Sequence, residues 1–420
     1  MHPSKEPPSG SRLIFVNRFY YPDISATSQI LTDLCVRLAR RGYRVEVVTS
    51  RSRYDDAAAG LPASEIVDGV LIRRVATTRF GRATTMGRLV DYVSFYLSSI
   101  VALWRTVRRG DVIVAKTDPP LLSVPCMLVA QLRGAHAINW FQDVFPEVAM
   151  AAGIGRRFGP AGRLLMATCR WGRDLSIRRA DANVVVGERM RRLLETRGSP
   201  SSKLATIPNW VDLTQIRPIA HDHNALRSQW GLEKAFVIGY SGNMGVAHDF
   251  NAILEAAQLL LGRPSIQFLL IGGGKQRQWL EAEIVRRGLA NIRLRPYQPR
   301  EQLSLSLSAA DVHLVSLRPS MEGLVVPSKF YGICAAARPT LFLGDPDGEL
   351  GVVIRREQCG ICVPDGNGTE LARAITMLAD EPALATRLGS AARRLVDQDH
   401  GGEEAAERWD RVLTDVLRRS

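Results

Sequence analysis

Short apolar runs alternate with amphipathic helical stretches along most of the chain. Stretches such as Gln29–Arg41 repeat apolar residues at helical spacing, and the runs between them are rich in β-branched residues. In the first half these candidate strands are Leu13–Val16, Val45–Val48, Val70–Ile72, Val112–Val114, Ala137–Phe141 and Asn183–Val186. The alternation predicts a parallel sheet with helices on both faces.

The same pattern restarts after a charged segment at 213–233. The further candidate strands are Phe236–Gly239, Phe268–Ile271, Ile292–Leu294, Val312–Val315 and Thr340–Leu343. We therefore expect an α/β protein with two doubly wound, Rossmann-like domains. The predicted boundaries are a disordered lead at 1–11, a first domain at 12–212, a linker at 213–233, a second domain at 234–398, and a last helix at 399–420 that packs back on the first domain. Ligands of such sheets bind beyond the carboxyl ends of the strands, which predicts a site in a central cleft that the two domains face.

The positive charge is confined to the first half. Residues 1–200 hold 30 Lys and Arg against 17 Asp and Glu, whereas the remaining 25 cations and 25 anions cancel. A basic domain beside a neutral one indicates contact with an anionic surface, which we take to be the cytoplasmic face of a membrane. The first residues lack the apolar run of a signal peptide, so we expect a cytosolic protein. A nucleic-acid-binding protein is the alternative, but the arginines are not interleaved with a base-reading motif.

Two segments are candidates for membrane contact. Arg88–Arg109 is apolar and aromatic but carries Asp91 and several serines, which favours an interfacial helix over a membrane span. Arg156–Arg179 places Leu164, Leu165 and Trp171 among arginines. The alternative, that both are ordinary helices covering the sheet, stays open at this stage.

The six cysteines are scattered, and we expect reduced thiols in the core. Cys359 and Cys362 have CxxC spacing, but their flanks predict a buried strand entering a turn and not half of a zinc site. Asp345-Pro-Asp347 imitates a metal-binding DxD motif without a second ligand set nearby. We predict no cofactor and no obligatory metal.

Two segments of the second domain carry the candidate chemistry, namely Gly239–Gly245 and Glu322–Lys329. A carboxylate, a lysine and backbone amides at strand-to-helix turns suit a ligand that has both sugar hydroxyls and a diphosphate. This combination predicts a nucleotide-sugar site.

Five motifs in order support this interpretation and carry a family resemblance. They are Pro208–Asp212, Tyr240–Gly245 with Ala247–Asp249, Ile271–Lys275, Ala309–Asp311 and Glu322–Tyr331. The chain resembles the retaining GT-B glycosyltransferases of family 4, and within them the branch that builds colanic acid and fucosamine-containing surface polysaccharides. The resemblance implies transfer of a sugar, with retention, from a nucleotide diphosphate to a polyprenyl-diphosphate-linked saccharide. We expect UDP in preference to GDP as the carrier, and a place in exopolysaccharide, capsule or O-antigen synthesis at the inner face of the plasma membrane.

The resemblance also implies roles in the donor site. Glu322 would contact the sugar hydroxyls, and the NH groups of Gly242, Asn243 and Gly245 would face the diphosphate at a helix that begins near His248. Many family members have Arg and Lys where this chain has Asn243 and His248, so we expect Lys329 to supply the positive charge, with Lys275 and Arg277 behind it. The other residues expected at the donor are Gly273, Tyr297, Gln298, Val326, Pro327 and Ser328. The second glutamate of the family is replaced by Gly332, or by Phe330 at the alternative spacing.

In the first domain, Gln142 and Asp143 follow a predicted strand where family members often carry His-Asp. Asp143 is a candidate general base, but front-face displacement, in which the departing phosphate takes the acceptor proton, favours an orienting role. The loop with Arg18 and Asp23, and the helix start at Ala26 and Thr27, are expected on the acceptor side, with Ser25 or Thr27 capping the helix. A sugar-nucleotide epimerase of the same fold remains the alternative enzyme, and would turn over donor without acceptor.

Overall fold

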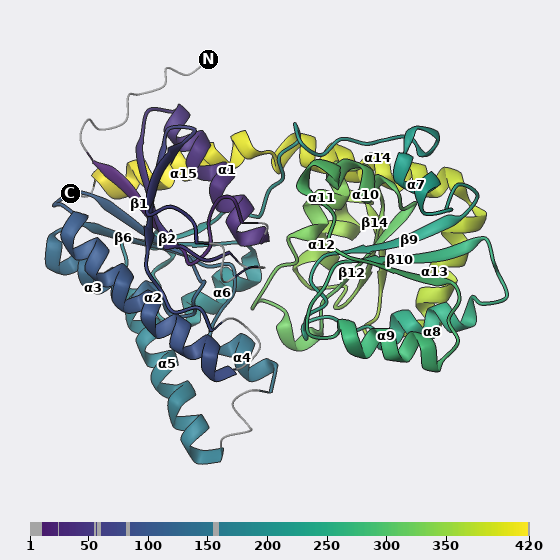
Figure 1. Ribbon diagram of the computed structural model, residues 1–420, viewed down its shortest axis with the longest axis horizontal. Helices are drawn as coiled ribbons and strands as arrows, with labels where there is room; N and C mark the ends of the chain where they lie inside the picture. Colours follow the sequence, from purple (N-terminus) through teal and green to yellow (C-terminus); the bar gives the residue numbers. More distant parts are fainter. Residues whose placement is uncertain are drawn as a thin grey trace. The chain divides into compact units, whose positions relative to one another are not determined.

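The computed structural model describes residues 11–23, 25–53, 56, 60–80, 85–153 and 159–418. Nearly all of the lead predicted at 1–11 lies outside this range, as does the start of the arginine-rich segment at 156–179. The chain divides into two compact units (Figure 1). The first comprises residues 1–208 and 402–420, and the second comprises residues 209–401.

The first unit is built on an eight-stranded sheet in the order β3-β4-β2-β1-β5-β6-β7-β8. Its strands are β1 (Arg12–Val16), β2 (Arg44–Ser50), β3 (Ser64–Val67), β4 (Val70–Val75), β5 (Val112–Ala115), β6 (His136–Trp140), β7 (Ala182–Val185) and β8 (Leu204–Thr206). Its helices are α1 (Ala26–Arg40), α2 (Thr85–Thr106), α3 (Ser123–Arg133), α4 (Glu147–Ala151), α5 (Gly159–Arg179), α6 (Glu188–Thr196) and α15 (Gly402–Arg418). Neighbouring strands run parallel, except that β3 and β4 form an antiparallel pair.

The strand order reverses at β1, which lies between β2 and β5. Loops at such a switch point diverge and leave a crevice at the carboxyl edge of the sheet. The loops after β1 and β5 meet here, because the Arg18 amide donates to the Asp118 carbonyl at 2.8 Å. This edge is where the sequence places Gln142, Asp143, Ala26 and Thr27.

The last helix, α15, belongs to the first unit and packs against α1 (Figure 1). Trp409 of α15 is fully buried, and its ring meets Trp140 edge-on with 4.8 Å between centroids. The Tyr43 hydroxyl donates to Asp410 at 2.6 Å, and Arg41 pairs with Glu403 at 3.0 Å. Two indole rings in edge-on contact, with a hydrogen bond and an ion pair beside them, therefore hold α15 against the first unit.

The second unit contains a six-stranded parallel sheet in the order β11-β10-β9-β12-β13-β14. The strands are β9 (Phe236–Ser241), β10 (Ile266–Ile271), β11 (Ile292–Arg295), β12 (Val312–Ser316), β13 (Thr340–Leu343) and β14 (Gly360–Val363). The helices are α7 (Ala225–Gln229), α8 (Asn251–Leu259), α9 (Arg277–Arg286), α10 (Leu303–Ser308), α11 (Lys329–Ala335), α12 (Glu349–Glu357), α13 (Gly368–Asp380) and α14 (Pro382–Asp399). Its switch point lies at β9 and β12.

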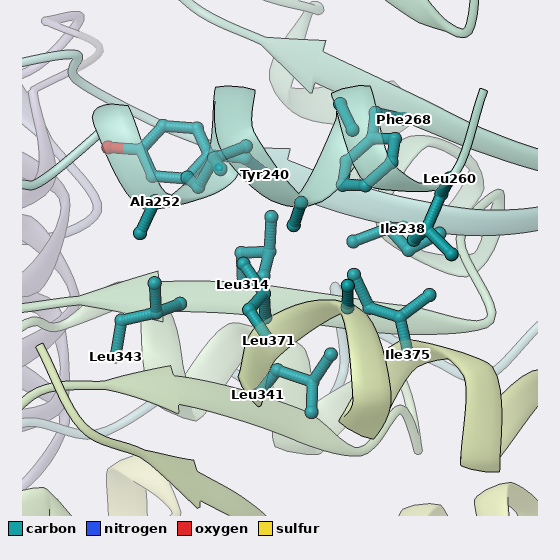
Figure 2. Packing of buried hydrophobic residues seen from close by; sticks show 14 of the residues in the cluster. Ile238, Tyr240, Ala252, Leu260, Phe268, Leu314, Leu341, Leu343, Leu371 and Ile375 are labelled. Carbon is teal, nitrogen blue, oxygen red and sulfur yellow. The ribbon is translucent and has the colours of Figure 1, made fainter. Parts of the chain in front are cut away.

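Figure 2 shows the core of the second unit, where apolar side chains of the central strands meet α8 and α13. Leu314 and Leu341 from the sheet lie near Leu371 and Ile375 of α13, and all four are fully buried. Strands covered by helices on both faces need apolar residues at nearly every position, which explains their continuous apolar runs. The segment predicted as a linker, 213–233, also belongs to this unit, and its residues Leu226 and Trp230 are buried in the core.

Candidate functional site

Two glycine turns interlock at the carboxyl edge of the second sheet. The turn after β10 lies so close to the turn after β9 that a Cβ atom on Gly272 would stand 2.0 Å from the Gly242 carbonyl oxygen. A Cβ on Gly274 would stand 2.4 Å from Oδ1 of Asn243, and both glycines have φ near +135°. The Met244 amide donates to the Gly273 carbonyl at 2.6 Å. Glycine is therefore required here for close backbone approach.

The prediction for the amides of this turn needs two corrections. The Gly242 amide donates to the Ile271 carbonyl at 2.9 Å, so it cannot face a phosphate. The following helix, α8, begins at Asn251 and not near His248. Asp249 lies just before this start, and its carboxylate accepts from the Asn251 amide at 3.0 Å. Asn243 and Gly245 are the remaining candidates for amide contacts.

Lys329 is the first residue of α11 and reaches back over the turn after β9. Its Nζ is buried without a hydrogen-bond partner and lies 3.8 Å from the centroid of the Tyr240 ring. A Cβ placed on Gly242 would be 3.5 Å from this Nζ. Burial lowers the pKa of Lys329 to about 7. When protonated, this amine has three N–H donors that no protein group uses, so it can bind an anionic group of a ligand.

His248 lies beside the same cluster. Its Nδ1 is 2.5 Å from the Ser316 carbonyl oxygen, and its ring meets Tyr240 edge-on at 5.9 Å. Burial, and then the charge of Lys329, lower the pKa of His248 to about 3. His248 is therefore neutral near pH 7 and does not replace the cation that many family members have at this position.

Glu322 follows β12 and reaches the loop after β13. Its Oε2 accepts from the Glu349 amide at 3.2 Å, at the start of α12, and its Oε1 lies close to Gly348. The carboxylate therefore joins two loops at the carboxyl edge of the sheet. This placement suits a sugar contact and also explains why Gly348 has no side chain, since a Cβ there would be 2.3 Å from Oε1.

The other predicted donor residues have less direct roles. Arg277 donates to the carbonyls of Gly272 and Arg295, so it supports the glycine turn. Lys275 is exposed, and Tyr297 is half-exposed beside Gly273. The side-chain Nε2 of Gln298 donates to the Pro296 carbonyl. Val326 and Pro327 are buried, and Ser328 occupies the N-cap position of α11.

Neither position expected for the second glutamate could hold one at the site. Phe330 is fully buried in the core. A Cβ on Gly332 would contact Leu307 at 3.6 Å and Ile216 at 3.7 Å, so this position faces packed apolar side chains. Both positions therefore serve the packing of the apolar core, where the charged side chain of a second glutamate would not fit.

Two further residues lie near this turn and were given no role of their own in the sequence-based prediction. Tyr240 carries the ring under Lys329, and its hydroxyl donates to the Asn243 carbonyl at 2.7 Å. Arg318 is exposed after β12, and its amide donates to the Ala247 carbonyl at 3.0 Å. Arg318 could have been considered from the sequence, because it lies only three positions after the strand predicted at Val312–Val315.

The first unit gathers charged groups at its own switch point. Burial raises the pKa of Asp143 to about 6, although a hydrogen bond from Thr117 opposes the shift. Gln142 is buried, and its Nε2 has no hydrogen-bond partner. A third residue, Lys116, was not anticipated; its Nζ donates to the Thr27 carbonyl at 2.5 Å and lies 4.1 Å from the Trp140 ring centroid. A cavity of about 10 Å³, room for roughly one water, is lined by Lys116 and Asp143 among others.

The predicted acceptor loop also needs correction. Arg18 is buried, and its Nη2 pairs with Asp91 of α2 at 3.0 Å. Its expected contact with the acceptor stays a prediction. Ser25 occupies the N-cap position of α1, but neither it nor Thr27 caps the helix through its side chain. Asp23 instead binds the backbone just before the helix, since its Oδ1 accepts from the Ser25 amide at 2.8 Å. Ala26 begins α1, and Thr27 is held by Lys116.

The described residues hold no cluster of three or more His, Cys, Asp or Glu arranged for a metal ion. All six cysteines are free thiols, and Cys362 lies in β14, as the interpretation of the CxxC spacing as a strand predicted. Asp347 of the DxD-like motif pairs with Arg355 at 2.6 Å. These motifs therefore have structural explanations.

Comparison with known proteins identifies the family. Residues 26–210 match the family model described as a glycosyl transferase 4-like domain, and residues 222–395 match the model for glycosyl transferases group 1. The probable glycosyltransferase WbjE of Pseudomonas aeruginosa is 27% identical over 76% of this chain and 78% of its own length. The putative colanic acid biosynthesis glycosyl transferase WcaI of Escherichia coli K12 is 26% identical over 79% of this chain and 83% of its own.

Among solved structures, HepE of Anabaena in complex with UDP-glucose superposes with a TM-score of 0.72 at 14% identity, covering 97% of this chain and all of the other. Likeness at this identity concerns the fold, which is the GT-B arrangement of two Rossmann-like domains. The predicted fold class and family are both confirmed. The chain belongs to the GT-B glycosyltransferases and combines a glycosyl transferase 4-like domain with a glycosyl transferases group 1 domain.

Proposed function

We propose that this enzyme transfers a sugar from a UDP-sugar to a polyprenyl-diphosphate-linked saccharide, with retention of configuration, during synthesis of a bacterial surface polysaccharide. The observation that carries the proposal is the buried, unpaired ammonium group of Lys329 at the switch point of the second sheet. A group of this kind suits the diphosphate of a nucleotide sugar, whose charge grows as the glycosyl bond breaks.

The donor is proposed to bind beyond the carboxyl ends of β9, β10 and β12. Lys329 would contact the diphosphate, with Arg318 and the amides of Asn243 and Gly245 nearby. Glu322 would hold hydroxyls of the sugar, since its carboxylate lies at the same edge of the sheet. A uridine carrier is supported by the similarity to HepE, which was solved with UDP-glucose.

Retention follows from front-face displacement in this proposal. The glycosyl bond to the diphosphate breaks as the acceptor oxygen approaches the same face, and that hydroxyl gives its proton to the leaving phosphate oxygen. Lys329 stabilises the departing diphosphate, and Asp143 orients the acceptor hydroxyl. The orienting role suits an ionised carboxylate, and a pKa of about 6 keeps Asp143 ionised above neutral pH.

The acceptor and the location are inferred from charge and from relatives. The relative WcaI is named for colanic acid biosynthesis, which supports a saccharide acceptor of a surface polymer. The first 200 residues contain the whole net charge of +13, which suits a lipid-linked diphosphate and an anionic membrane. We therefore place the enzyme in the cytoplasm, peripherally attached to the inner face of the plasma membrane, with no nucleic acid as partner.

We propose that transfer needs no metal and no other cofactor. The ammonium group of Lys329 would stabilise the negative charge of the leaving diphosphate, which a divalent ion does in other transferases. Initial rates measured in excess EDTA should equal those without it. Complete loss of activity, restored by Mn²⁺ or Mg²⁺, would overturn this part.

The direct test incubates purified enzyme with labelled UDP-sugars and a polyprenyl-diphosphate-linked saccharide. The expected product is a lipid-linked saccharide one sugar longer, with the anomeric configuration of the donor by proton NMR. Turnover of the donor into an epimer without acceptor would identify the alternative enzyme instead. An inverted anomeric centre would reject the retaining scheme alone.

A further inference from the structure

One face of α2 contradicts the usual pattern of a surface helix. Every exposed residue between positions 86 and 104 is apolar: Met86, Leu89, Val90, Val93, Leu97, Val101 and Trp104. They recur at three- and four-residue spacing, so they form a continuous stripe along the helix. A surface helix normally exposes polar residues, and an apolar stripe of this length indicates a surface that is covered in the working protein.

The neighbouring helices extend this surface. Packing places α3 between α2 and α5, and α3 exposes Leu128 and Leu132. The outer face of α5 carries Leu164, Leu165 and Trp171. We call the exposed apolar residues of α2, α3 and α5 the apolar face.

The exposed charged residues of these three helices all carry the same sign. Arg105, Arg163 and Arg178 are exposed on these helices, and the Arg133 guanidinium lies 5.5 Å from the Trp104 ring centroid. The carboxylates of the three helices are Asp91 and Asp174, and both are buried in ion pairs with arginines. An apolar surface with cationic borders and no exposed carboxylate is complementary to a bilayer that contains anionic lipids.

The opposite face of α2 decides how the helix meets the bilayer. Among the described residues, the segment Met86–Thr106 is long and apolar enough to cross a membrane. However, Phe95 and Leu103 are fully buried in the core of the first unit, and Asp91 binds Arg18 and Thr78. A helix that lies against a protein core along its whole length cannot be surrounded by lipid.

We propose that α2 lies in the plane of the membrane interface, with the stripe from Met86 to Trp104 inserted among the acyl chains of an anionic leaflet. This inference deepens the proposed function by naming the surface that brings the enzyme to its lipid-linked acceptor. The ion pair between Asp91 and Arg18 ties this helix to the loop after β1. Docking of α2 therefore also fixes the acceptor-side edge of the sheet relative to the bilayer.

The test uses flotation of the full-length protein with vesicles of phosphatidylcholine alone or mixed with phosphatidylglycerol. The variant Leu97→Glu/Val101→Glu alters the stripe, and Leu259→Glu/Val285→Glu, on exposed positions of the second unit, adds the same charge elsewhere. Wild type and control should float with the mixed vesicles, whereas the stripe variant binds at least about tenfold more weakly. Carbonate at pH 11 should release the wild-type protein, since an interfacial helix is extractable.

Equal flotation of the stripe variant and the wild type would overturn the proposal, and so would retention after carbonate treatment. A wild-type dimer in light scattering that the stripe variant dissociates would show that a second copy covers the surface instead. Thermal shifts with UDP-sugars separate this proposal from the proposed function, because the stripe variant should keep them. Flotation without any nucleotide-sugar shift would leave the membrane surface standing and reject the donor site.

Discussion

The ammonium group of Lys329 lies 3.8 Å from the centroid of the Tyr240 ring, and a Cβ on Gly242 would be 3.5 Å from the same nitrogen. The aromatic face stabilises the cation without occupying its hydrogen-bond donors. The two residues come from β9 and α11, so the contact joins the two sides of the switch point of the second sheet. The donor site proposed here depends on this pair.

Donor affinity should fall as pH rises above about 7. The pKa of Lys329 is lowered to about 7 in the free protein, and a bound diphosphate favours the charged form and raises it. Binding at pH 8–9 therefore requires uptake of a proton, and the dissociation constant should rise by up to about tenfold per pH unit. Calorimetry of donor binding in buffers of different ionisation enthalpy measures the uptake.

Lys329→Arg is the matched control for this pH dependence, because a guanidinium stays protonated throughout this range. The variant should bind with an affinity independent of pH between 7 and 9. A wild type that shows no proton uptake would contradict the assignment of Lys329 to the diphosphate.

Gly272→Ala should destroy the interlocked turns. The added Cβ would meet the Gly242 carbonyl oxygen at 2.0 Å, and φ is +138°. The strain should cost at least about 1–3 kcal/mol of unfolding free energy and abolish donor binding. Gly262→Ala is the control, since nothing lies within 4 Å of its Cβ position; chemical denaturation of both variants makes the comparison. Equal stability would show that the turns are not in close contact.

Asp143→Asn should stabilise the protein at pH 8 while slowing transfer. Burial raises the pKa of Asp143 from 3.8 to about 6, so the folded state binds more protons than the unfolded state between these values and stability falls as pH rises through this window. The asparagine avoids the cost of the buried charge, so its advantage in melting temperature should vanish below about pH 4. An orienting carboxylate predicts a higher acceptor KM with residual kcat. A complete loss of kcat would favour a general base instead.

Trp409→Ala should destabilise the first unit by about 3–5 kcal/mol, because a fully buried indole between Phe15 and Trp140 leaves a cavity. Asp415→Ala, at an exposed position of the same helix, should have little effect. Thermal unfolding followed by circular dichroism distinguishes them. Similar melting temperatures would mean that α15 contributes little to the unit.

The strands were largely predictable because buried parallel strands need continuous apolar runs. The strand predicted at Phe268–Ile271 corresponds to β10, and that at Thr340–Leu343 to β13. Two short strands were missed: Ser64–Val67 has a half-exposed, alternating pattern, and Leu204–Thr206 has only three residues. Neither contains enough apolar residues to form a recognisable run.

The candidate site was predictable only in its outline. Glycines and polar residues after strands indicated which loops gather at the sheet edge, but not which side chains turn inward. Arg18 pairs with Asp91, which lies 73 positions away in the sequence, and Lys329 of the helix α11 lies over the tyrosine ring of the strand β9. Such pairings depend on the three-dimensional packing of separate elements, which spacing along the chain does not reveal.

The central claim is that Lys329 holds the diphosphate of a nucleotide sugar. A thermal-shift panel of UDP-, GDP- and dTDP-sugars on wild type, Lys329→Ala and the exposed control Lys275→Ala tests it most directly. We predict that UDP-sugars raise the melting temperature of wild type and of Lys275→Ala but not of Lys329→Ala. An undiminished shift in Lys329→Ala, or no shift with any nucleotide sugar in the wild type, would contradict the account.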